Sequence, residues 1–177
     1  MDTYTHFIIG PNGVGKSTTL SFLKKFLPSE SFEIYDFEER GAPNIDFLEW
    51  VKLETQHWVD VGAENQKNGK RTIVCGFARP EEVEELFARN TNPASVILLD
   101  ADPMTIQDRI SAAYDTEEKI QELYNTTGKT PKEVMDENIF YSKFLRQRCT
   151  VHGTMIVDTS DKTPEMVASE VIAYIYG

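Results

Sequence analysis

Cysteine is scarce in this chain, and long apolar runs are absent. The 177 residues include two cysteines, Cys75 and Cys149, 74 positions apart. Two thiols so far apart exclude a disulfide-rich scaffold and cannot complete a zinc site by themselves. The apolar runs are short, as in Val96–Leu99. Runs of this length suit neither a secretory signal nor a membrane span, so we expect a soluble cytoplasmic protein.

Basic residues are also in short supply. Eighteen lysines and arginines stand against 29 aspartates and glutamates, which gives a formal net charge of −11. A broad nucleic-acid-binding face needs clustered Lys and Arg to neutralise phosphates, and an anionic membrane surface needs the same. We therefore expect neither a nucleic-acid polymer nor a membrane as a partner.

The chain instead alternates short apolar runs with longer amphipathic ones. Runs rich in Val, Ile, Leu or Phe predict five strands, at Tyr4–Ile9, Phe32–Tyr35, Thr72–Cys75, Ser95–Leu99 and Thr154–Val157. Helical spacing predicts helices at Lys16–Leu27, Asp46–Asn68, Pro80–Arg89, Pro103–Tyr124, Pro131–Cys149 and Pro164–Tyr176. The second helix has a predicted core-facing stripe of Trp50, Val51, Leu53, His57, Trp58 and Val61. This alternation over residues 1–177 is typical of one doubly wound α/β domain.

One stretch breaks the alternation. Residues 111–149 contain no predicted strand and are mostly helical, with an interruption predicted at Asn125–Thr130. Such a stretch can form a mobile lid over a site, or a static pair of packed helices. The sequence leaves both interpretations open.

The most specific motif follows the first predicted strand and precedes the first predicted helix. It satisfies G-x-x-x-x-G-K-[ST] and, with the next residue, comprises Gly10, Pro11, Asn12, Gly13, Val14, Gly15, Lys16, Ser17 and Thr18. The glycines let backbone N–H groups surround phosphate oxygens, and the helix presents its positive end to the same anion. Lys16 can reach the β- and γ-phosphates, and the Ser17 hydroxyl can ligate Mg²⁺. The motif predicts binding of ATP with Mg²⁺.

Three later segments carry a family resemblance, namely Ile73–Arg79 (IVCGFAR), Val96–Ile110 (VILLDADPMTIQDRI) and Met155–Glu165 (MIVDTSDKTPE). Together with the loop, they resemble the adenylate-kinase-like group of P-loop kinases, which includes the nucleoside monophosphate kinases and related small-molecule kinases. The resemblance implies a three-layer P-loop NTPase fold, with a five-stranded parallel sheet in the order 2-3-1-4-5 and a helical lid at 111–149.

The resemblance also implies roles for individual arginines. Arg79 would hold a phosphate or other anionic group of the acceptor. Arg109 would clamp ATP at the base of the lid, although a helix surface would also tolerate it. Arg146 or Arg148 would close over the transferring phosphoryl group, where guanidinium groups can stabilise the charge.

A second set of candidates surrounds the end of the second predicted strand. Asp36 follows that strand, where ligands of open α/β sheets bind, and could accept a hydroxyl proton or hold a Mg²⁺-bound water. It could equally be a turn residue or a helix cap. Arg40 is a further candidate for binding the acceptor, and the family resemblance implies that residues 38–67 form the acceptor-binding region.

The sequence also departs from the family pattern. Cys75 stands where most nucleoside monophosphate kinases have Asp, Ala78 replaces a proline, and Ala113 replaces a second arginine at the lid base. These departures argue against adenylate kinase itself. Val96–Asp100 also resembles the apolar strand and Asp that hold Mg²⁺ in many P-loop ATPases, but Ala101 stands where those proteins usually have Glu.

These observations favour an ATP-dependent kinase that transfers the γ-phosphoryl group to a nucleotide, a nucleoside or a similar small acceptor. The alternative is a P-loop ATPase or a nucleotide-binding regulatory protein without a small acceptor. A third interpretation, suggested by Cys75, is a partner-binding protein with a degenerate kinase fold.

Overall fold

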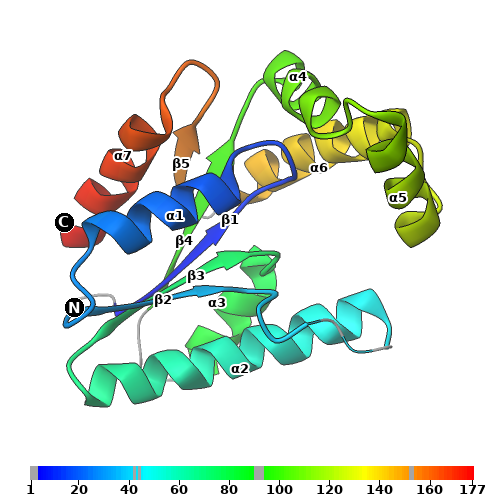
Figure 1. Cartoon of the computed structure of the whole chain (residues 1–177). Coiled ribbons are helices and arrows are strands. Elements are labelled where there is room, and N and C mark those ends of the chain that lie inside the picture. Colours follow the sequence, from blue (N-terminus) through cyan, green and yellow to red (C-terminus); the bar gives the residue numbers. More distant parts are fainter. Residues whose placement is uncertain (1–3, 42, 44, 90–93, 152–153) are drawn as a thin grey trace.

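The computed structural model describes the chain except residues 1–3, 42, 44, 90–93 and 152–153 (Figure 1). Its strands are β1 (Thr5–Ile9), β2 (Phe32–Asp36), β3 (Arg71–Gly76), β4 (Ala94–Asp100) and β5 (Met155–Asp158). Its helices are α1 (Lys16–Phe26), α2 (Phe47–Lys67), α3 (Pro80–Arg89), α4 (Pro103–Ala113), α5 (Glu117–Thr127), α6 (Pro131–Val151) and α7 (Pro164–Tyr176).

The five strands form one parallel sheet in the order β2-β3-β1-β4-β5, which confirms the predicted topology. The strand that leads into the phosphate loop, β1, is therefore central, with β3 on one side and β4 on the other. Because all strands run in one direction, their carboxyl ends meet at one edge, and the loops that follow them surround a common space.

Helices cover both faces of the sheet. One core cluster packs α1 and α7 against the sheet through side chains such as Leu23, Ile97 and Val171. The other packs α2, α3 and the second half of α6 against the opposite face through Trp58, Val83 and Leu145. Figure 1 shows α5 and the beginning of α6 extending away from the sheet, beside α4. In the described residues, no helix combines the length and apolar character needed to cross a membrane.

Two sequence predictions about helices were wrong. The predicted helix Pro103–Tyr124 is two helices, because the backbone leaves the helix at Tyr114 and the Thr116 side chain caps a new helix by accepting from the N–H of Lys119. The break predicted at Asn125–Thr130 is shorter: α5 continues to Thr127 and ends at Gly128, whose φ is +71°.

The core-facing stripe of α2 is also rotated from the prediction. Trp50, Val51 and Trp58 are buried as predicted, but Leu53 is 58% exposed and Glu54 is buried in its place. The helix can bury Glu54 because the Arg40 guanidinium lies 3.3 Å from its carboxylate. The inner face of α2 therefore carries Glu54, paired with Arg40, and the apolar Leu53 side chain lies on the outer face.

Candidate functional site

The phosphate loop joins β1 to α1, as its motif requires. Gly13 and Gly15 have φ angles of +85° and +91°, which side chains with a Cβ rarely adopt. Gly10 has no room for a Cβ, because that atom would lie 2.4 Å from the carbonyl oxygen of Leu99 in β4. Three glycines of the motif are therefore required by the shape of the loop or by its contact with the sheet.

Lys16 lies at the centre of this loop. Its Nζ donates to the carbonyl oxygens of Gly10 and Pro11, each at 2.9 Å, and lies 5.2 Å from the ring centroid of Phe77. Around it is a cavity of about 330 Å³, lined by Asn12, Gly13, Gly15, Lys16, Ser17, Thr18 and Arg109. The arrangement can receive an anion at the beginning of α1.

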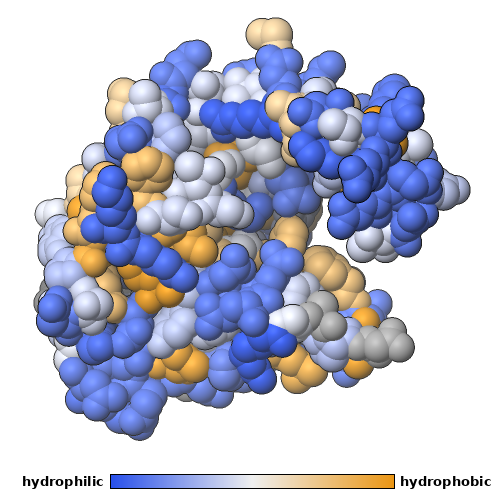
Figure 2. Space-filling view, in the orientation of Figure 1, coloured by the Kyte–Doolittle hydropathy of each residue, from blue (hydrophilic) through white to orange (hydrophobic). Residues whose placement is uncertain are grey.

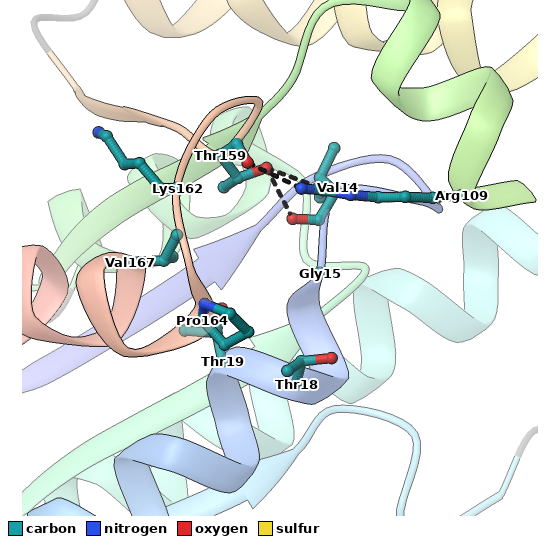
Figure 3. Close-up of a pocket in the computed structure, with 9 residues that line it drawn as sticks. All are labelled: Val14, Gly15, Thr18, Thr19, Arg109, Thr159, Lys162, Pro164 and Val167. Atoms are coloured by element: carbon teal, nitrogen blue, oxygen red, sulfur yellow. Dashed lines mark hydrogen bonds between the residues drawn. The ribbon is translucent and has the colours of Figure 1, made fainter.

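Arg109 ties the phosphate loop to the segment after β5 (Figure 3). Its guanidinium donates to the Gly13 carbonyl at 3.2 Å and to the Thr159 carbonyl and hydroxyl at 2.8 and 3.0 Å. Thr159 in turn donates to the carbonyl of Val14. These bonds hold three segments together at the place where the sequence predicts a nucleotide clamp.

A second cavity, of about 160 Å³, adjoins the first. It is lined by Val14, Gly15, Thr18, Thr19, Arg109, Thr159, Lys162, Pro164 and Val167 (Figure 3). The two cavities share the lining residues Gly15, Thr18 and Arg109, so they lie side by side between the phosphate loop and the beginning of α7.

Asp36 ends β2 beside Cys75 of β3. The Asp36 carboxylate accepts from the backbone N–H of Glu38 at 2.9 Å, so it forms the predicted type of turn contact. Burial raises the pKa of Glu38, and the nearby charge of Asp36 raises it further. Burial lowers the pKa of Lys16, although these acidic groups oppose the shift. Asp36 and Glu38 therefore place negative charge near the phosphate-loop lysine.

The Cys75 thiol lies near the end of β3, beside the phosphate loop. It donates to the carbonyl oxygen of Lys16 at 3.6 Å, and burial raises its pKa to about 12. The group is therefore neutral at ordinary pH and supplies no charge to a cation.

The donor set for a metal ion is small. Among the described residues, no cluster of three or more His, Cys, Asp or Glu side chains could hold one. The Ser17 hydroxyl lies exposed at the beginning of α1, beside Lys16. Because Mg²⁺ commonly keeps several waters and binds through substrate phosphates, the exposed Ser17 hydroxyl is the side chain here that would contact a Mg²⁺ ion delivered with a nucleotide.

Arg146 pairs with Asp100 at the end of β4. Its Nε donates to one carboxylate oxygen of Asp100, and the Ser142 hydroxyl donates to the other. Asp100 is fully buried, whereas the Arg146 side chain is 53% exposed. The neighbouring Arg148 is exposed and lies over the ring of Phe144. Each carboxylate oxygen of Asp100 thus accepts a hydrogen bond from a side chain of α6.

The two arginines predicted to bind the acceptor both have acidic partners. Arg79 forms ion pairs with Glu81 and Glu82, and Arg40 pairs with Glu54. Arg79 also lines a third cavity, of about 620 Å³, whose walls are Asn12, Phe47, Leu48, Phe77, Arg79, Lys129, Glu137, Asn138, Phe140, Tyr141 and Phe144. This cavity shares Asn12 with the phosphate cavity, so the two spaces meet at the phosphate loop.

The structure thus gathers Lys16, Ser17, Thr18 and Arg109 around one site and puts Arg79 beside the adjoining cavity.

Sequence reasoning missed several residues that line the site or contact the phosphate loop. Thr159 and Lys162 lie in the segment MIVDTSDKTPE that carried the family resemblance, so that segment could have suggested them. Asn138 could not be found in this way: its side chain accepts from the N–H of Asn12 across 126 positions of sequence.

Comparison with solved structures shows the same fold. Shikimate kinase from Aquifex aeolicus is 17% identical with a TM-score of 0.53, over 98% of this chain and 96% of that one. The tunicamycin resistance protein of Deinococcus radiodurans is 16% identical with a TM-score of 0.63, over 98% and 95%. A sugar kinase from Janibacter is 15% identical with a TM-score of 0.60, over 98% and 95%.

No protein-family model matches the chain, and neither does any curated protein. The chain therefore has the fold of P-loop small-molecule kinases, established by structural similarity at low identity.

Proposed function

We propose that this protein is an ATP- and Mg²⁺-dependent kinase that transfers the γ-phosphoryl group to a small acceptor. The observation that carries the proposal is the meeting of two cavities at Asn12, one suited to a nucleotide and one large enough for a separate small molecule. Phosphoryl transfer needs this adjacency, because the acceptor must lie in line with the γ-phosphorus. Two of the structural neighbours are named as kinases of small molecules, shikimate and a sugar, which supports the same class.

Each part of the site has a role in the proposal. The loop N–H groups and Lys16 bind the β- and γ-phosphates, while Arg109 holds the loop against the nucleotide. Ser17 would hold Mg²⁺, which would neutralise charge on the phosphate oxygens. Asp36 would accept a hydrogen bond from a hydroxyl group of the acceptor and so orient it.

The surrounding segments complete the site. Residues 38–67 and 111–149 border the acceptor, and the second of these closes as a lid. When the lid closes, Arg146 would move toward the phosphoryl group. In this structure it donates a hydrogen bond to Asp100 instead.

Calorimetry and a turnover assay test the proposal. Binding of the non-hydrolysable ATP analogue AMP-PNP with Mg²⁺ is measured first. ADP release from ATP is then followed with nucleosides, nucleoside monophosphates, shikimate, sugars and small alcohols. Acceptor-stimulated ADP release is the expected result. Turnover that no acceptor stimulates would support an ATPase instead, and failure to bind AMP-PNP would contradict both.

A further inference from the structure

The wall of the third cavity is largely apolar, although the site is expected to receive a polar acceptor. Six of its lining residues are apolar or aromatic: Phe47, Leu48, Phe77, Phe140, Tyr141 and Phe144. Three of these are exposed large apolar side chains, with exposed fractions of 55% for Phe47, 54% for Leu48 and 74% for Phe140. Exposed apolar side chains gathered around one concave site indicate a ligand that covers them.

These side chains come from opposite walls. Phe47 and Leu48 begin α2, whereas Phe140, Tyr141 and Phe144 belong to α6. Figure 2 shows the molecule hollowed between the lobe that contains α5 and the beginning of α2. Tyr141 and Phe144 stack with ring centroids 6.2 Å apart, and Phe47 meets Phe77 edge to face at 6.1 Å. Aromatic side chains of both α2 and α6 therefore line the cavity, where a planar ring can pack against them.

The cations at this cavity are already balanced by carboxylates. Arg79 pairs with Glu81 and Glu82, and Lys129 lies 2.6 Å from the carboxylate of Glu137. Of these three carboxylates, that of Glu137 lines the cavity. An acceptor phosphate would have to compete with these ion pairs for Arg79 and Lys129, whereas an uncharged acceptor would leave the pairs intact.

Two residues join this cavity to the centre of phosphoryl transfer. Asn12 lines both the third cavity and the phosphate cavity. Phe77 lines the third cavity while its ring contacts the ammonium group of Lys16. A ring bound in the cavity therefore lies next to the lysine that would hold the γ-phosphate.

We infer that, if the protein is the proposed kinase, its acceptor is an uncharged molecule with a planar ring and a hydroxyl group, such as a nucleoside or an aromatic alcohol. It is neither a nucleotide nor a ring-free polyol. A cavity of about 620 Å³ is within the usual range for small-molecule sites. In the transfer, the acceptor hydroxyl oxygen bonds to the γ-phosphorus, the bond from that phosphorus to the ADP oxygen breaks, and the hydroxyl proton passes to water.

Calorimetry with matched compounds tests this inference without relying on turnover. The nucleotide site is first saturated with AMP-PNP and Mg²⁺. Uridine, thymidine and 2-phenylethanol are then compared with their monophosphates and with the ring-free alcohols erythritol and glycerol. We expect at least one uncharged ring compound to bind at least tenfold more tightly than its monophosphate and than either ring-free alcohol.

A variant locates the binding. Phe140→Ala removes a highly exposed ring and is expected to weaken binding of that ring compound at least fivefold. Phe26→Ala removes an exposed phenylalanine of α1 that does not line the cavity, and should leave binding unchanged. Equal effects of the two substitutions would overturn the assignment of the cavity.

The remaining outcomes separate this inference from the proposed function. Tighter binding of the monophosphates or of the ring-free alcohols would overturn the inference, as would failure of all the uncharged ring compounds to bind. If a ring compound binds in the cavity but receives no phosphoryl group from ATP, the ring-binding site stands and the proposed kinase activity falls.

Discussion

At the scale of single residues, Lys16 holds the charge on which phosphate binding depends. Its ammonium group is bound to two carbonyl oxygens of its own loop, and a nucleotide phosphate would replace these neutral partners with charged ones. Hydrogen bonds to charged groups contribute about 1.5–3 kcal/mol. Lys16→Ala should therefore weaken AMP-PNP binding about 10- to 100-fold by calorimetry.

The matched control is Lys24→Ala, which removes an exposed lysine from the same helix. That variant should bind AMP-PNP like the unaltered protein. If both substitutions weakened binding to the same extent, the loss would reflect net charge rather than the phosphate loop.

Ionisation of the buried Cys75 thiol should make the free energy of unfolding depend on pH. Burial raises its pKa from 9.0 to about 12, so between these values the unfolded chain loses a proton that the folded protein keeps. The favourable contribution of the neutral thiol is therefore complete below pH 9 and is lost as pH rises toward 12. From pH 8 to pH 10.5, the unaltered protein should lose about 1–2 kcal/mol more unfolding free energy than Cys75→Ala.

Urea unfolding at a series of pH values measures this difference. Comparing the slopes cancels the packing cost of the substitution itself, which is the same at each pH. Parallel slopes for the two proteins would show that the thiol ionises equally in the folded and unfolded states.

At the scale of secondary-structure elements, α6 is anchored to the sheet by an ion pair. Among the described residues, Arg146→Ala would leave the buried carboxylate of Asp100 with the Ser142 hydroxyl as its remaining side-chain donor. Because the arginine itself is half exposed, solvent reduces the loss to about 1–2 kcal/mol of unfolding free energy, measured by urea unfolding.

Arg148→Ala is the control for this helix. Arg148 is exposed and stacks on Phe144, so its removal should lower the free energy of unfolding by about 0.5 kcal/mol or less. A double variant with Asp100→Asn should show coupling between Asp100 and Arg146. Additive effects would mean that the ion pair does not stabilise the helix.

Most elements were predictable from local patterns, and the exceptions have physical causes. The strands and the phosphate loop depend on neighbouring residues, so short windows of sequence revealed them. The burial of Glu54 depends on Arg40, 14 positions away, and could not be found from helical periodicity. The break between α4 and α5 has a local signal, because Thr116 is a suitable N-cap, but apolar spacing through the break masked it.

At the scale of the whole molecule, the acidic charge and the nucleotide site are compatible. The net charge is −11, yet Lys16, Arg109 and Lys162 line the cavities around the phosphate loop. Surface charges are screened beyond about 8 Å at physiological salt, whereas phosphate ligands are contacted at about 3 Å. A few well-placed cations can therefore bind a small polyanion within an acidic protein.

The candidate site was only partly predictable, because some of its contacts are local in sequence and others join distant segments. The ion pairs of Arg79 with Glu81 and Glu82 span two or three positions and could have been anticipated from the sequence. The aromatic cavity combines residues of α2, of the segment after β3 and of α6, and no local pattern brings those segments together. Tertiary structure was therefore needed to show that aromatic side chains line the cavity beside Arg79.

The arrangement of α5 and α6 leads to a prediction about motion. All residues of α5 are described, and Leu123 is its one buried side chain. We expect AMP-PNP to slow amide hydrogen exchange in α5 and the first half of α6, because closure of the lid would bury their backbone. Exchange in the second half of α2 serves as the control. Protection limited to the phosphate loop and α1 would instead indicate a static helical pair.

Transfer of a labelled phosphoryl group distinguishes a small-molecule kinase from an ATPase in one experiment. The protein is incubated with Mg²⁺, [γ-³²P]ATP and the best-binding uncharged ring compound, and the label is then traced among ATP, inorganic phosphate and the organic product. We expect the label to move to the acceptor, and we expect Lys16→Ala to abolish this transfer. Label that appears in inorganic phosphate at the same rate with and without acceptor would contradict this expectation.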